Sequence, residues 1–225
     1  MRYIPKKENN EPSSLRAYRE TTPKANYEGF SDARQLLKKA LLEEQGHLCA
    51  YCMKRISLKR NRALKPRIEV EHFRTQSSNP ELDLDYKNML GVCNGYTFKS
   101  EHCDKSKKDK NLQVLNPLEK TVEAQITFSL NGYLSSKKNN TKVEEDIELL
   151  NLNDQNIVEA RKKVIDLART FLIRKKPIGQ WTKVIIQKEI DEWKSKNKAG
   201  KFREYCQVAI WFWEQQLKKS RYPAK

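Results

Sequence analysis

The sequence lacks any long apolar run, and it also lacks the features of an exported protein. No stretch of about 18 apolar residues occurs, so we expect no segment that spans a membrane. The opening MRYIPKKENNEPSS contains no apolar core of the kind that a secretory signal needs. We therefore expect a cytoplasmic protein whose five cysteines stay reduced, and reduced cysteines favour metal binding over disulfides.

Acidic residues are scarce relative to basic ones. The chain has 45 Lys and Arg against 29 Asp and Glu, a formal charge of +16, so a polyanion is the expected partner. Residues 49–120 carry a net +6 (15 basic against 9 acidic), residues 175–225 a net +8 (13 against 5), and residues 121–174 none. Two basic surfaces joined by a neutral packing element favour a groove for a phosphate backbone. A generally basic, soluble surface is the alternative.

Apolar residues make up 37% of the 225 residues, which is low, yet the 9% of aromatic residues argue against wholesale disorder. No internal repeat appears. The texture of the sequence divides the chain into residues 1–48 (an N-terminal arm and helix), 49–120 (an irregular core rich in Cys, Asn and Lys) and 121–225 (a hairpin and a helical region). The predicted fold class is α+β and mostly helical.

Local patterns predict most of the individual elements. Prolines within the first 30 residues indicate an extended arm, and Ser31 is expected to cap a helix that ends at Gly46. Asn131-Gly132 predicts a hairpin between strands over 125–130 and 133–134. Three further helices are predicted: one capped by Asp154 that runs to Phe171, one from Trp181 to Trp193 after a break at Pro177 and Gly179, and one from Phe202 to Leu217.

Four cysteines fall in the central region, at Cys49, Cys52, Cys93 and Cys103. A Cys-x-x-Cys turn directs two thiolates at one ion, and two further thiolates complete a closed structural zinc site. His102 could replace Cys103 as the fourth ligand. The alternative is that these cysteines are small buried hydrophobic residues, which is the simplest interpretation of Cys206.

An acidic strand that ends in a histidine lies between the two cysteine pairs. In Ile68-Glu69-Val70-Glu71-His72 the side chains alternate, so Glu69 and Glu71 share one face and Val70 and His72 the other. A carboxylate beside a histidine at a strand end can provide a metal ligand and a general base for one phosphate. A solvated acidic strand ending in a surface histidine is the alternative.

Taken together, these stretches resemble HNH endonucleases with a ββα-metal core and a four-cysteine zinc site. The stretches are Gln45–Cys52, Glu69–Arg74, Pro80–Leu82, an Asn sixteen residues after His72, Cys103-Asp104-x-x-Lys107 and Leu149–Asn153. The closer resemblance, over about residues 35–160, is to the small PtuB-like HNH component of Septu-type anti-phage systems, which also occurs beside retrons. The resemblance implies catalytic Mg²⁺ or Mn²⁺, a nucleic-acid substrate that is more often DNA than RNA, and an ABC-like ATPase partner.

The resemblance also assigns roles to individual residues. It implies that His72 is the general base, that Glu71 holds the catalytic metal, and that Asn88 orients the histidine. Asp104 stands where the family usually has His or Asn, and a carboxylate is a sound ligand for a hard cation. Asp109 is the fallback for this position. Lys107 would face the phosphate or form part of a solvated basic run from Lys105 to Lys110.

Other interpretations stay open. A zinc module that binds nucleic acid without cutting it accounts for the charge and the cysteines, but it gives Glu71, His72, Asn88 and Asp104 no common task. The same site could cut structured RNA such as a tRNA. The aromatic residues Trp211, Phe212 and Trp213 either pack in the core or form the surface that docks the ATPase, for which the N-terminal arm is an equal candidate.

Overall fold

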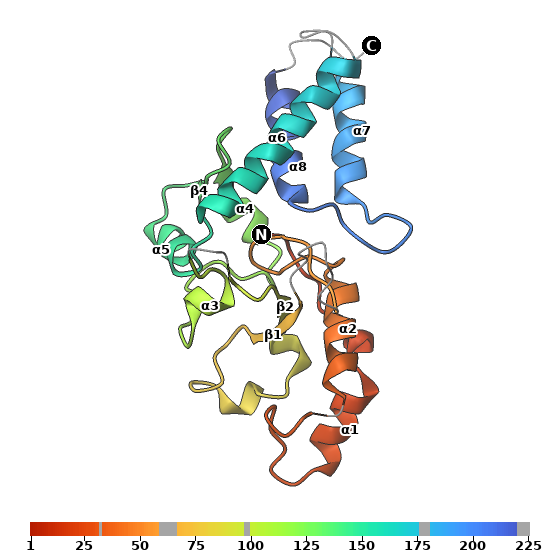
Figure 1. Ribbon diagram of the computed structural model, residues 1–225, viewed down its shortest axis with the longest axis vertical. Helices are drawn as coiled ribbons and strands as arrows, with labels where there is room; N and C mark the ends of the chain where they lie inside the picture. Colours follow the sequence, from red (N-terminus) through yellow and green to blue (C-terminus); the bar gives the residue numbers. More distant parts are fainter. Residues whose placement is uncertain (32, 59–66, 97–99, 176–180, 220–225) are drawn as a thin grey trace.

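The computed structural model describes residues 1–31, 33–58, 67–96, 100–175 and 181–219. The molecule is elongated, with α1 (Ser13–Thr21) and α2 (Arg34–Glu44) toward one end and the three helices α6 (Gln155–Lys175), α7 (Lys183–Lys194) and α8 (Cys206–Lys219) at the other (Figure 1). Between them lie two small sheets and short helices. These are β1 (Glu69–His72), β2 (Met89–Val92), α3 (Asp104–Lys107), α4 (Val122–Gln125), β3 (Ile126–Phe128), β4 (Leu134–Ser136) and α5 (Thr141–Leu149), with 3₁₀ turns at Glu8–Asn10, Pro80–Leu82 and Tyr86–Asn88.

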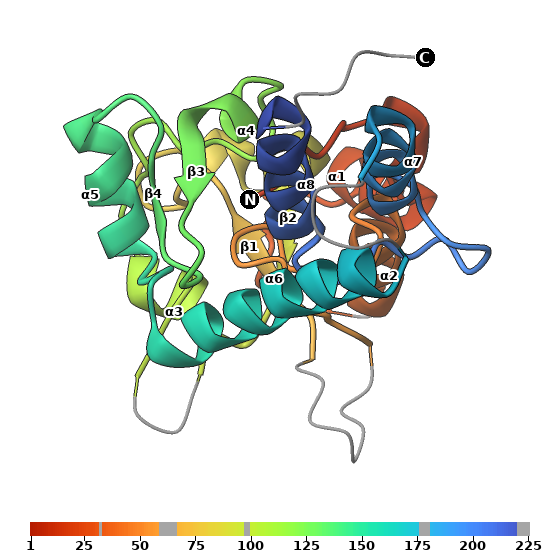
Figure 2. The ribbon, with the colours of Figure 1, turned by 90° about the horizontal axis from the view of Figure 1, so that it is seen from above.

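The fold is therefore mixed α and β with small sheets, in agreement with the α+β class predicted from the sequence patterns. Strands β1 and β2 are antiparallel, with Glu71 opposite Leu90 and His72 opposite Met89. Strands β3 and β4 form the predicted hairpin, and they lie between α5 and α8 (Figure 2). Within the described ranges, no helix is long and apolar enough to cross a membrane.

Helix α2 is attached to β2 by the side chain of Gln45. Its amide nitrogen donates to the carbonyls of Leu48 (2.9 Å) and Gly91 (2.7 Å), and its amide oxygen accepts from the Gly91 N–H. Leu37, Leu41 and Leu42 are buried on the same helix. The predicted helix is confirmed, but Ala33 occupies the cap position and makes no side-chain cap hydrogen bond, so the expected Ser31 cap is wrong.

The prediction that the first 30 residues form an extended arm is wrong. Pro12 immediately precedes α1, where its fixed φ favours a helix start and its missing N–H costs nothing. Met1, Ile4, Leu15 and Phe30 are all buried, and the Ile4 N–H donates to the Pro117 carbonyl. The prolines thus mark the ends of packed segments rather than an unpacked tail.

Helix α8 buries two of its three aromatic residues and partly buries the third. Phe212 and Trp213 are 2% and 0% exposed, and the Trp211 indole N–H donates to Thr127 Oγ1 (3.1 Å). The alternative in which this cluster docks a partner is therefore wrong, and the core-packing interpretation is confirmed. Cys206 is also buried, as expected. Helix α8 begins four residues later than predicted, and the predicted break at Pro177 and Gly179 lies outside the described residues.

Gly46 joins the end of α2 to the segment that leads into α8. It has φ +58°, and a Cβ at this position would collide with the ring of Phe202. The Phe202 N–H donates to the Gly46 carbonyl (3.1 Å), and Arg55 donates to the same carbonyl (3.0 Å). The absence of a side chain at residue 46 therefore allows the N-terminal and C-terminal parts to meet.

We expect Gly46→Ala to destabilise the protein more than Gly200→Ala. Both glycines have positive φ, so each alanine costs about 1–2 kcal/mol of unfolding free energy. Gly200 has no heavy atom within 4 Å of a built Cβ, whereas Gly46 meets Phe202, which adds about 1–3 kcal/mol. Denaturant unfolding of the two variants measures the difference. Equal destabilisation would show that Phe202 does not require the glycine.

Candidate metal and catalytic site

The four predicted cysteines converge in the structure. One sulfur atom from each of Cys49, Cys52, Cys93 and Cys103 lies within 4.8 Å of the others, and all four residues are buried. The Cys49 and Cys103 sulfur atoms are 3.9 Å apart, and those of Cys52 and Cys93 are 3.8 Å apart. A tetrahedral zinc ion with bonds of about 2.3 Å to sulfur needs sulfur atoms about 3.8 Å apart. The spacing of the thiols therefore fits a metal such as zinc.

The four cysteines lie on three separate segments of the chain. Cys49 and Cys52 lie in a turn closed by the Met53 N–H, which donates to the Cys49 carbonyl, with Met53 at φ +65°. Cys93 directly follows β2, and Cys103 directly precedes α3. The Cys103 N–H donates to the Leu150 carbonyl (2.8 Å), which fixes the start of α3.

His102 lies beside the cluster without being one of its four members. Its Nδ1 is 3.1 Å from the Cys103 sulfur and 3.9 Å from the Cys93 sulfur, and the residue is buried. The four sulfur atoms already supply a complete tetrahedral ligand set. The geometry therefore favours Cys103 over His102 as the fourth ligand.

The charges around the cluster also suit a bound cation. Although burial opposes ionisation, hydrogen bonds from the neighbouring thiols hold the pKa of Cys49 well below its usual range, while burial and Cys49 raise the pKa of Cys103. Only a cation would allow all four buried thiols to ionise. Arg161 is fully buried, and its Nε and Nη2 have no hydrogen-bond partner among the described residues.

Burial lowers the pKa of Arg161 to about 10, and the charges of Cys52 and Tyr205 oppose this shift. A zinc ion with four thiolates carries a net charge of −2, half of which a buried guanidinium nearby would balance. Arg161 was not identified from the sequence, because its helix pattern marks it as an ordinary polar residue on α6. The Nη1 of Arg161 donates to Gly132 and Asn153, and the incomplete hydrogen bonding of the rest of this guanidinium supports a negatively charged metal site.

Glu71 lies at the centre of the second cluster. Its Oε1 accepts from the Tyr51 hydroxyl (2.9 Å) and contacts the Lys107 Nζ (2.7 Å), which leaves Oε2 without a basic partner in the described part of the chain. Burial and the neighbouring Asp104 carboxylate raise the pKa of Glu71 to about 8, against the opposing charge of Lys107. The two neighbouring carboxyl groups repel each other when both are ionised, and a bound divalent cation would stabilise their ionised forms.

Lys107 does not belong to a solvated basic run. It is 1% exposed and forms its ion pair with Glu71 inside the molecule. That alternative is wrong because α3 turns Lys107 inward, onto the same side as Asp104 at the start of the helix. Asp109, the fallback for Asp104, is exposed.

His72 is held in one orientation by the loop that follows β1. Its Nε2 lies 2.8 Å from the Asp83 carbonyl oxygen, so Nε2 carries the proton and donates it. The other ring nitrogen, Nδ1, is then a proton acceptor. Burial lowers the pKa of His72, which keeps the ring neutral near neutral pH. The Tyr27 and His72 rings pack edge to face, with their centroids 4.8 Å apart.

Strand alternation puts Glu71 and His72 on opposite faces, yet both are buried, at 5% and 6% exposure. The open, solvated strand of the alternative interpretation is therefore wrong. Tyr51 and α3 cover the Glu71 side, and the loop of residues 73–88 covers the His72 side. The Asp104 carboxyl group helps to raise the pKa of Glu71, and His72 follows Glu71 on β1 with its ring on the other face. These three residues are named the candidate catalytic cluster below.

Asn88 fixes this loop rather than the histidine itself. Its side chain accepts from the Arg74 N–H (2.7 Å) and donates to the carbonyls of Arg74 (3.0 Å) and Leu82 (3.4 Å). Leu82 precedes Asp83, whose carbonyl orients His72. Asp83 and Tyr51 were not identified as site residues from the sequence. Tyr51 lies inside the Cys-x-x-Cys turn, and this position was a signal that it is close to the metal site.

Two proteins of known family name match the chain. It is 25% identical over 177 residues to "Retron Vc95 putative HNH endonuclease" of Vibrio cholerae serotype O1 biovar El Tor. This match covers 72% of the chain and 82% of that protein. It is also 28% identical over 170 residues to "Retron Ec83 putative HNH endonuclease" of Escherichia coli. This second match covers 57% of the chain and 64% of that protein. The chain is similar to HNH endonucleases. This similarity supports a nuclease, although no protein-family model matches the chain.

We expect Cys52→Ala to abolish zinc binding, whereas Cys206→Ala keeps it. Both cysteines are fully buried, but Cys206 lies outside the cluster. Structural zinc contributes about 10–16 kcal/mol of apparent binding free energy in small zinc domains, so its loss should also lower the melting temperature sharply. Elemental analysis of the purified proteins and thermal unfolding measure both effects. Equal zinc content in the two variants would contradict the four-cysteine site.

Proposed function

We propose that the protein is a metal-dependent HNH nuclease that hydrolyses phosphodiester bonds. In this proposal β1, β2 and α3 form the ββα-metal core. The observation that supports it most is the pair of Glu71 and Asp104 carboxyl groups, next along β1 to a histidine whose Nε2 is held by the Asp83 carbonyl, so that Nδ1 is the proton acceptor. The two HNH-named relatives support the same reaction class.

In the proposed mechanism His72 accepts a proton at Nδ1 from the water that attacks phosphorus. The Nε2 hydrogen bond to Asp83 keeps the ring in the required tautomer, and Asn88 holds the loop that carries this carbonyl. Glu71 and Asp104 would hold Mg²⁺ or Mn²⁺, which supplies positive charge for the phosphorane-like transition state and the departing oxygen. Tyr51 orients Glu71 by donating to Oε1.

Lys107 has a place in the same proposal. Its ammonium group neutralises the buried Glu71 carboxylate at Oε1 and so offsets part of the cost of burying that charge. Because Lys107 contacts Oε1, this ion pair would leave the other carboxylate oxygen of Glu71 for a metal. Lys107 then keeps the oxygens of Glu71 oriented toward the metal position, and it does not contact the phosphate as the resemblance implies.

We propose DNA as the substrate and a cytoplasmic role in bacterial anti-phage defence, with an ABC-like ATPase as partner. The resemblance to PtuB-like proteins of Septu systems supports the ATPase partner, and both relatives are named as retron proteins. Structured RNA is the second candidate substrate, because hydrolysis of the phosphodiester hardly depends on the sugar. A zinc module without catalysis is the weaker alternative, since it leaves the Glu71, His72 and Asp104 cluster without a task.

We expect His72→Ala to lower the cleavage rate by about 10²–10⁴ while zinc content and melting temperature stay close to wild type. The matched control is His47→Asn, because His47 lies outside the cluster and its positive φ of 64° is tolerated by Asn. End-labelled DNA and RNA of the same sequence, incubated with Mg²⁺ or Mn²⁺, measure the rate and identify the substrate. Cleavage by His72→Ala at the wild-type rate would exclude His72 as the base.

We expect Asp104→Asn to require a higher concentration of Mg²⁺ or Mn²⁺ for half-maximal cleavage, whereas Asp109→Asn behaves as wild type. Asp104 lies beside Glu71, and Asp109 is exposed. Losing one carboxylate removes charge that a hard cation requires. Metal titrations of the cleavage rate compare the two variants. The reverse result would assign the third catalytic position to Asp109.

A further inference from the structure

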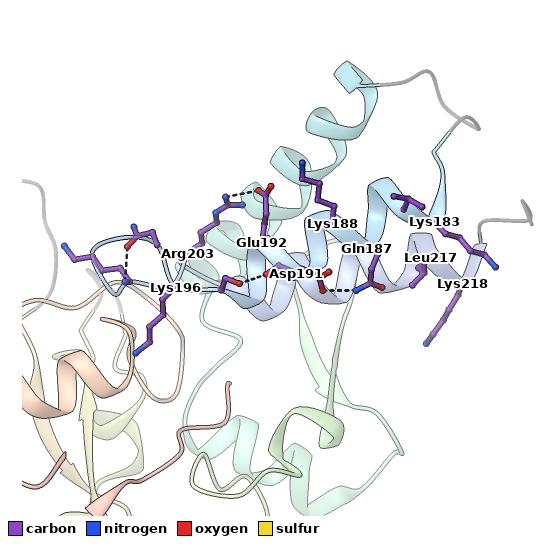
Figure 3. Close-up of a pocket in the computed structure, with 13 residues that line it drawn as sticks. Lys183, Gln187, Lys188, Asp191, Glu192, Lys196, Arg203, Leu217 and Lys218 are labelled. Carbon is purple, nitrogen blue, oxygen red and sulfur yellow. Dashed lines mark hydrogen bonds and ion pairs between the residues drawn. The ribbon is translucent and has the colours of Figure 1, made fainter. Parts of the chain in front are cut away.

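A large open groove runs beside α7 and α8, at the end of the molecule away from β1, β2 and α3 (Figure 1). Its volume is about 1110 Å³, and its walls come from α7, from the segment 195–203 and from the last turns of α8. The long side chains of Lys183, Lys188 and Lys218 extend from these helices (Figure 3). The groove contains no residue of the proposed catalytic cluster.

The groove is strongly basic. Five lysines and Arg203 line it against Asp191 and Glu192, a net charge of 6 − 2 = +4. Glu192 contacts Arg203 (3.5 Å), and Asp191 accepts a hydrogen bond from the Gln187 amide (2.9 Å), so both acids already have partners (Figure 3).

Four of the groove lysines can bind an anion, because no carboxylate among the described residues neutralises them. Lys183, Lys188, Lys201 and Lys218 form no ion pair with a carboxylate in the part of the chain that the structure describes. Lys196 differs, because its Nζ donates to the carbonyls of Glu43 and Glu44 at the end of α2. Burial and the nearby charge of Arg2 lower the pKa of Lys196. Positive charge therefore continues from the groove toward the N-terminal segment.

The length and composition of the groove favour a nucleic acid over a protein. Helix α7 has 12 residues, and at about 1.5 Å per residue its axis spans roughly 17 Å. One strand of a duplex places a phosphate about every 3.4 Å, so several phosphates would lie along this wall. Lysine is depleted in protein–protein interfaces, where aromatic residues and arginine replace it.

We propose that this groove, defined by Lys183, Lys188, Lys201 and Lys218, binds the phosphate backbone of the nucleic acid outside the stretch that is cut. The inference rests on the proposed nuclease function, since it gives the substrate a second contact surface. Contacts of this kind are independent of base sequence, and they fix the register of the duplex without reading it.

The test replaces these four lysines with Gln in a His72→Ala background, so that binding is measured without cleavage. The matched control replaces Lys137, Lys138, Lys162 and Lys163, which are exposed and lie outside the groove, with the same change in charge. Binding of labelled duplex DNA and of matched RNA is measured at several salt concentrations. Zinc content and melting temperature establish that both variants fold.

We expect the groove variant to bind at least about tenfold more weakly than the control variant. The slope of log K against log salt should become shallower by about 3.6, because each lost phosphate contact contributes about 0.9. Equal affinity and equal slope in the two variants would overturn the proposal. The proposal would also be overturned if the groove variant kept its affinity and lost a co-expressed protein, a result that would assign the groove to protein docking.

A second measurement separates this proposal from the nuclease proposal. With His72 intact, the groove variant should hydrolyse bis(p-nitrophenyl) phosphate at the wild-type rate, because this small diester has no flanking backbone to bind. If the wild type hydrolyses neither this diester nor nucleic acid, the nuclease proposal fails whatever the groove does. If the groove variant cleaves nucleic acid as fast as the wild type at low substrate concentration, the groove proposal alone fails.

Discussion

The convergence of the four cysteines is the constraint on which the rest of the structure depends. They join three stretches that are distant in the sequence: the turn after α2, the end of β2 and the start of α3. Asp104 follows Cys103 directly and β1 pairs with β2, so the sulfur cluster determines how closely Asp104 approaches Glu71. A metal at the cluster would thus act on the candidate catalytic site through the backbone, over short segments that have little freedom.

Burial of charge is the second feature that organises the molecule. Glu71 and Lys107 are removed from water together, and Arg161 is removed from water without a full set of hydrogen bonds. An isolated buried charge costs several kcal/mol, so such groups persist where a partner of opposite sign compensates them. For Glu71 the partner is Lys107, and a negatively charged metal–thiolate cluster would be the partner for Arg161. The incompletely hydrogen-bonded Arg161 therefore supports a metal at the four cysteines, whereas Lys107 compensates the charge of Glu71.

The basic residues of the chain serve different purposes in different places. Lys107 is an internal counter-charge, Lys196 binds carbonyl groups at the end of α2, and Lys183 and Lys188 extend into an open groove. The net charge of a segment does not distinguish these roles, because a lysine contributes the same formal charge whether it is buried or solvated. The charge excess of residues 175–225 correctly indicated a basic C-terminal surface. The excess of residues 49–120 overstated the basic surface there, because it included Lys107, which is buried in an ion pair with Glu71.

Local patterns in the sequence predicted elements that depend on neighbours along the chain. The Asn131-Gly132 hairpin, helix α2 and the strand at Glu69–His72 are examples, since turn preferences and side-chain alternation act over a few residues. Apart from the Ser31 cap, the predictions that failed concern which face of a segment is covered. Phe212 and Trp213 face the core rather than a partner, and residues 1–30 pack instead of extending, because burial depends on segments that are distant in the sequence.

The sequence by itself determined the chemical inventory: four thiols at the spacing of a metal site, a carboxylate beside a histidine, and a surplus of basic residues. The tertiary structure alone decided how these groups are used. It paired Glu71 with Lys107, turned the Nε2 of His72 toward Asp83, and, within the described residues, left four lysines of the groove without acidic partners. The physical reason is that the kind of side chain is encoded locally, whereas its solvation and its partners are properties of the packed chain.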